Sequence, residues 1–99
     1  MQYLTPFPGF SKTQILGRRK EELRHAIKHN ATPGKVAKAA ERVRTAKLHL
    51  IKALQHSLAE QKLTDPSVTD QLENLQRETE HWERLSTDEI IERYNTKRA

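Results

Sequence analysis

The residues of this 99-residue chain that are best suited to chemistry are its cations. Lys and Arg outnumber Asp and Glu by 13 to 4 in residues 1–62, whereas residues 63–99 carry 5 cations against 9 carboxylates. The net charge of +5 therefore combines a basic part with an acidic part. A basic surface on a helical chain is typical of proteins that contact a polyanion.

Six basic side chains share one flank of a helix that the sequence predicts over residues 33–62. At 100° per residue they fall within an arc of roughly 100°, and they extend over roughly 30 Å of helix. Lys and Arg on one exposed helix face are enough to contact the phosphate backbone of DNA or RNA. The pattern predicts a non-enzymatic nucleic-acid-binding stripe of Lys35, Lys38, Arg42, His49, Lys52 and His56.

Two plainer interpretations compete with nucleic-acid binding. A charge-rich helix face is often simply solvated. Alternatively, the acidic helix predicted after residue 63 neutralises the stripe across the bundle. Surface ion pairs are individually weak, so this second interpretation requires many of them to form at once.

A second apolar set on the same helix points away from the face that contains Val43. One helix cannot bury both faces alone, so the first helix or a second chain must cover this set. The alternative function is therefore a protein–protein interaction adaptor or regulator, and we expect a homodimer, with a monomer left open. The predicted protein-interface residues are Leu48, Ile51 and Leu58.

Lys47 falls in the middle of the apolar face, where an unpaired ammonium group would cost several kcal/mol. It must reach solvent or pair, and a glutamate of the third helix is the natural partner. A catalytic lysine of lowered pKa would instead indicate a small all-helical enzyme. Against this third function, the sequence has no glycine-rich phosphate loop and no nucleophile elbow.

Metal ligands are suggested only by spacing. Glu22 and His25 on the first helix match Glu78 and His81 on the third, and this Glu-x-x-His spacing occurs in di-iron bundles. On a helical wheel neither histidine projects into the apolar seam. His29 lies four residues after His25, but no third ligand follows at a fixed spacing, and the chain has no Cys. We therefore expect no metal and no cofactor.

Start and stop signals divide the chain into helices. Thr32 before Pro33 and Asp65 before Pro66 each combine a capping side chain with proline at the first helical position, and Asn30 suits a left-handed stop. Between residues 86 and 89, the Ser-x-x-Glu pattern of a capping box starts a short last helix. The predicted helices cover residues 12–29, 33–62 and 66–85, followed by the short helix from 87.

Composition sets the fold class. Hydrophobic residues make up 34% of the chain and charged residues 31%, which indicates a thin core shared by long helices. The prediction is an all-α antiparallel bundle of three main helices and a short C-terminal helix, forming one domain over residues 12–96 with a frayed tail at 97–99. No apolar stretch approaches the length of a membrane span, so we expect no membrane contact and a cytoplasmic location.

The predicted N-terminal arm, residues 1–11, is extended because Pro6 and Pro8 fix φ and remove hydrogen-bond donors. It carries most of the aromatic residues of the chain, namely Tyr3, Phe7 and Phe10. The arm is expected either to lie along the bundle or to insert into a partner.

Overall fold

The computed structural model describes residues 10–95, and within them it contains helices and turns but no strand, so the all-α prediction is confirmed. None of the helices in this part of the chain is long and apolar enough to cross a membrane. The elements are α1 (Phe10–Lys28), α2 (Pro33–Lys62), the 3-10 turn η1 (Pro66–Val68), α3 (Thr69–Arg84) and α4 (Thr87–Tyr94).

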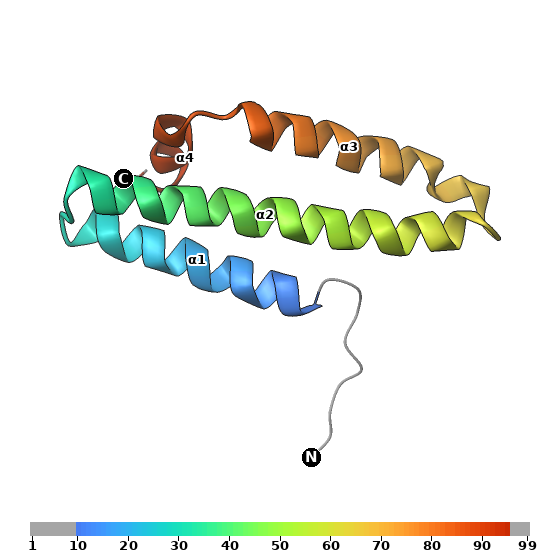
Figure 1. Ribbon diagram of the computed structural model, residues 1–99, viewed down its shortest axis with the longest axis horizontal. Coiled ribbons are helices and arrows are strands. Elements are labelled where there is room, and N and C mark those ends of the chain that lie inside the picture. The colour runs from blue at the N-terminus through green and yellow to red at the C-terminus, as the bar shows by residue number, and fades with distance from the viewer. Residues whose placement is uncertain (1–9, 96–99) are drawn as a thin grey trace, which may run out of the picture.

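The long helix α2 runs through the middle of the molecule, with α1 along one side and α3 along the other (Figure 1). The short helix α4 packs near the beginning of α2 and also approaches α1. No Cα atom of α1 lies within 8 Å of one in α3, so α2 separates these two helices. One face of α2 therefore remains open between its neighbours.

Local sequence signals account for most helix ends. The Thr32 hydroxyl accepts a hydrogen bond from the backbone N–H of Lys35, and Asn30 has φ 55°, as predicted for the stop of the first helix. The capping box is also confirmed, because the Ser86 hydroxyl accepts from the Glu89 N–H at 3.1 Å and the Glu89 carboxylate accepts from the Ser86 N–H at 2.8 Å. These backbone groups would otherwise lack helical partners.

One predicted boundary is wrong. Helix α1 begins at Phe10, so Phe10 and Ser11 belong to its first turn and not to the N-terminal arm. The predicted start of the third helical segment at Asp65 and Pro66 is confirmed, because the Asp65 carboxylate accepts a hydrogen bond from the Ser67 N–H at 3.1 Å. Its first turn, η1, is a 3-10 turn that continues into α3 at Thr69. The rest of the arm, residues 1–9, and the predicted tail lie outside the described residues.

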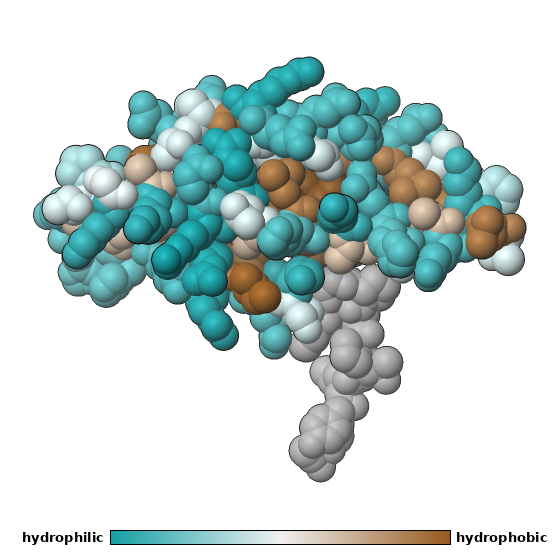
Figure 2. Space-filling view, in the orientation of Figure 1, coloured by the Kyte–Doolittle hydropathy of each residue, from teal (hydrophilic) through white to brown (hydrophobic). Residues whose placement is uncertain are grey.

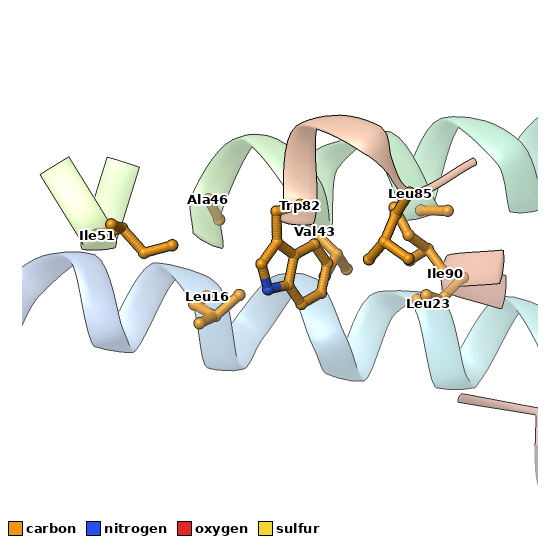
Figure 3. Close-up of a cluster of buried hydrophobic side chains, with 9 residues drawn as sticks. Leu16, Leu23, Val43, Ala46, Ile51, Trp82, Leu85 and Ile90 are labelled. Carbon is orange, nitrogen blue, oxygen red and sulfur yellow. The ribbon is translucent and has the colours of Figure 1, made fainter. Parts of the chain in front are cut away.

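The hydrophobic core is small, as the composition predicts. Hydrophilic side chains cover most of the face seen in Figure 2, and separate hydrophobic patches interrupt them. Figure 3 shows the buried cluster, to which all four helices contribute. Its members are Leu16, Leu23, Ala40, Val43, Ala46, Ile51, Trp82, Leu85 and Ile90.

Arginine side chains pack on the aromatic rings of α3 and α4. The Cζ atom of Arg93 lies 5.3 Å from the centre of the Trp82 ring, and Arg24 approaches the Tyr94 ring equally closely. Cations over aromatic faces are attracted by the ring quadrupole. Burial raises the pKa of Tyr94, and the nearby Arg24 charge opposes that rise. These contacts tie α4 to α3 and to α1.

The corner between α3 and α4 is fastened to α2 by Arg44, a residue that the sequence did not single out. Its guanidinium donates hydrogen bonds to the carbonyl oxygens of Trp82 and Leu85, and its side chain is only 16% exposed. Carbonyls at a helix C-terminus lack helical partners and carry partial negative charge, so they suit a cation. Arg44 thereby links α2 to the C-terminal end of α3.

Glu41 completes the same corner. Its carboxylate accepts a hydrogen bond from the Thr87 hydroxyl at 2.6 Å and pairs with Arg44 at 3.0 Å. The Thr87 hydrogen bond, followed by the Arg44 contact, lowers the pKa of Glu41. One residue pair on α2 therefore holds the last turn of α3 and the first turn of α4.

Candidate nucleic-acid interface

All six residues of the predicted stripe are exposed on α2. Neighbouring members of the stripe are three, four or seven residues apart, and these spacings keep all six on one side of the helix. This side is opposite the buried Ala40 and Ile51 on the helical wheel. It is the face that α1 and α3 leave uncovered.

The acidic helix does not neutralise the stripe by direct ion pairs. Within residues 10–95, no carboxylate oxygen lies within 4.0 Å of the side-chain nitrogens of Lys35, Lys38, Arg42 or Lys52. His56 faces Glu60 of its own helix at 3.6 Å, an ion pair only when the imidazole is protonated. Four permanent cations are therefore free to meet an external anion.

A shallow hollow between α1 and α2 adds a cation that the sequence analysis missed. Arg19 of α1 reaches its rim opposite Lys38 and Arg42, and Glu22 holds the Arg19 guanidinium at 3.1 Å. Only the packing of α1 against α2 brings Arg19 to the stripe. The hollow is lined by Ile15, Arg19, Lys38, Glu41, Arg42, Thr45, Ala46 and His49.

A second hollow, between α2 and α3, is electrically mixed. Glu83 of α3 shares it with His49 and Lys52, although no ion pair within 4.0 Å joins them. A phosphate near this rim would be repelled by Glu83. The rim on the α1 side has three permanent cations, of which Arg19 already pairs with Glu22, and one carboxylate, Glu41, which already pairs with Arg44. The open face is therefore most attractive to anions on the side of α1.

The predicted protein interface does not form one free patch in this structure. Ile51 is 1% exposed and belongs to the core, and Leu48 packs against that core half-buried. Leu58 lies elsewhere, in a groove nearer the end of α2. The reason is that α3 covers this flank of α2, whereas the sequence predicted the first helix or a second chain there.

Lys47 has no glutamate partner within 4.0 Å in the described part of the chain, in contrast to the expected pairing with the third helix. Its Nζ atom instead lies 5.9 Å from the centre of the Trp82 ring. A desolvated cation over an aromatic face gains part of the stabilisation that an ion pair would give. Arg44 is the α2 cation that contacts the C-terminal end of α3 through hydrogen bonds.

The histidines do not converge on a metal. Among residues 10–95, no three His, Cys, Asp or Glu side chains come close enough together to hold an ion. The rings of His25 and His29 contact each other at an interplanar angle of 46°, with centres 4.2 Å apart, and His81 Nε2 lies 2.9 Å from an Arg93 nitrogen. Neither predicted Glu-x-x-His pair meets the other, since α2 lies between α1 and α3.

Comparison with known proteins supplies no functional assignment. No family model, no curated protein and no solved structure matches this chain. The function is therefore argued from the charges and shape of the described surface.

Proposed function

We propose that this protein binds the phosphate backbone of DNA or RNA through the open face of α2. The observation that carries the proposal is the row of four exposed Lys and Arg side chains that have no carboxylate within 4.0 Å, with Arg19 of α1 beside them. Ordinary solvated helix faces mix both signs of charge. Between Lys35 and His56, α2 carries a single carboxylate, Glu41, which lies beside the stripe and already pairs with Arg44.

The scaffold suits this role because a single helix carries the cations. From Lys35 to His56 there are 21 residue steps, so the stripe extends over roughly 30 Å at about 1.5 Å per step. That length is comparable with one turn of a nucleic-acid duplex. We infer an antiparallel arrangement of α1, α2 and α3 as the frame that keeps α2 straight and leaves this face uncovered.

Phosphate binding of this kind has a characteristic salt dependence. Each neutralised phosphate releases counterions, so four to five contacts give a slope of about −4 in log affinity against log salt. Backbone contacts alone carry no sequence preference.

The test is fluorescence anisotropy of labelled single-stranded and duplex DNA and RNA at several salt concentrations. The variant Lys38→Glu, Arg42→Glu and Lys52→Glu should lower affinity at least about tenfold, since it replaces attraction by repulsion. The matched control is Lys28→Glu, Arg77→Glu and Arg84→Glu, which changes the net charge equally at exposed positions outside both hollows. Equal losses in the two variants would contradict the stripe, and no binding by the unaltered protein at low salt would reject the function.

A helical adaptor that binds another protein is the second candidate. It is favoured by the apolar groove that Leu54, Leu58 and Leu75 line between α2 and α3. Salt separates the two functions, because an apolar interface is nearly insensitive to salt concentrations that abolish phosphate contacts.

A further inference from the structure

The groove between the last turns of α2 and the first turns of α3 lies outside the proposed nucleic-acid interface. Three half-buried leucines form its floor: Leu54 and Leu58 from α2 and Leu75 from α3. Polar side chains form its rim, namely Ser57, Gln61, Gln71, Asn74 and Glu78.

Within residues 10–95, nothing covers the groove because α1 is shorter than α2. At about 1.5 Å per residue, the 19 residues of α1 extend over about 28 Å and the 30 residues of α2 over about 45 Å. Figure 1 shows that α1 begins near the middle of α2, so among the described residues the last turns of α2 have only α3 and η1 as neighbours. Two helices alone cannot bury an apolar face that needs the further helices of a bundle to cover it.

The rim of the groove indicates what covers it. A two-fold interface brings each patch against an identical patch, so a patch with several like charges would repel its own copy. This groove is nearly neutral: its rim has three amides and a hydroxyl, which both donate and accept hydrogen bonds, and one charged residue, Glu78. In a chain with 31% charged residues, such a patch is electrostatically compatible with itself.

We propose that the groove is the contact surface between two copies of this chain. The α2–α3 hairpins of the two copies face one another and together form a four-helix unit over the leucines, which is a stable solution for amphipathic hairpins. On the helical wheel of α2, Leu54 lies nearly opposite His56. Pairing through the groove therefore leaves the basic stripe of each copy exposed, and the proposal does not depend on nucleic-acid binding.

The experiment is sedimentation equilibrium of the full chain from about 1 to 200 μM, with helicity checked by circular dichroism. We expect a reversible dimer, and Leu58→Glu should raise its dissociation constant at least tenfold. The matched control is Leu63→Glu, since Leu63 is 87% exposed at the same end of the molecule but does not line the groove. Leu63→Glu should leave the dimer unchanged.

A second pair of variants covers the case in which Leu58→Glu fails to fold. Gln71→Glu and Gln71→Lys place like charges at the exposed rim without altering the leucines. Each variant alone should be largely monomeric, and an equimolar mixture should form a one-to-one heterodimer, seen by native mass spectrometry. Heterodimer formation on mixing requires that the groove rim at Gln71 faces a second copy of the chain.

Three results would overturn the proposal. The first is an unaltered chain that stays monomeric at every concentration. The second is a dimer that withstands both Leu58→Glu and the Gln71 variants. The third is a full chain that is monomeric together with a truncated chain, lacking residues 1–9, that dimerises. That result would mean that the chain's own N-terminal segment covers the groove.

Discussion

The two ends of α2 carry similar apolar patterns but differ in how deeply those side chains are buried. At the N-terminal end, α1, α3 and α4 converge, and Val43 and Ala40 are 0% exposed. At the C-terminal end, the leucines at 54 and 58 remain half-buried beside α3. The number of neighbouring helices, and not the sequence of α2, sets this difference.

The polar contacts differ in the same way. At the four-helix end, Arg44 and Glu41 join three helices through hydrogen bonds to distant residues. At the two-helix end, the contacts are mostly local, such as the hydrogen bond from Arg77 to Asn74 three residues earlier. Stability should therefore be concentrated at the four-helix end, and a new interface is available at the other.

The largest expected effect is loss of the core tryptophan. Trp82→Ala should lower the free energy of unfolding by about 3–5 kcal/mol, because it leaves a cavity among the buried side chains of all four helices. Leu75→Ala at the two-helix end should cost only about 1 kcal/mol in protein dilute enough to be monomeric. Urea unfolding followed by circular dichroism measures both, and similar costs would remove the distinction between the ends.

Next in size is the Arg44 corner. Arg44→Ala should cost about 2–3 kcal/mol, because the carbonyls of Trp82 and Leu85 lose their charged donor in a partly buried setting. The control, Arg77→Ala, removes an exposed arginine from the other end and should change stability by less than about 0.5 kcal/mol. The same urea titration serves here, and a large effect of Arg77→Ala would show that local contacts matter as much as the corner.

A smaller effect is expected from the α4 capping box. Ser86→Ala should cost about 1 kcal/mol, since the Glu89 N–H loses its acceptor. Ser86→Asn should restore most of the stability, because asparagine is an equally good cap. Thermal unfolding of both variants checks this, and equal destabilisation by Ala and Asn would mean that the hydroxyl acts by some means other than capping.

The smallest expected effect is the pH dependence contributed by Glu41. Its pKa is lowered in the folded protein, first by the Thr87 hydroxyl and then by Arg44. The contribution is therefore complete above the ordinary pKa of about 4.5 and is lost as the pH falls through the lower folded value. Glu41→Gln should be less stable at pH 7, and its deficit should shrink below pH 4.5; a constant deficit down to pH 2.5 would contradict this.

Much of the architecture could be predicted because it depends on neighbours in the chain. Proline and cap residues determined the starts of α2 and α4, and the periodicity of α2 placed its six basic residues on one exposed side. The start of α1 was predicted two residues late, because Ser11 looked like a cap although the helix begins at Phe10. Whether the stripe binds nucleic acid remains a prediction.

Contacts between distant residues could not be predicted. Nothing in the spacing of Arg44 indicates that it meets carbonyls 38 and 41 residues later, and nothing in Arg19 indicates that it joins the stripe. Ile51 was predicted to be covered by the first helix or by a second chain, but it is buried in the core on the flank of α2 where α3 packs. These outcomes depend on which helices pack together.

The sequence by itself determined that the chain is helical, that α2 is its longest helix and that its cations share one side, because these follow from local propensity and the 3.6-residue period. Only the tertiary structure decided which apolar residues are buried, which carboxylates are engaged and where the bundle is left open. Burial and ion pairing depend on distances between helices, and local patterns do not encode those distances.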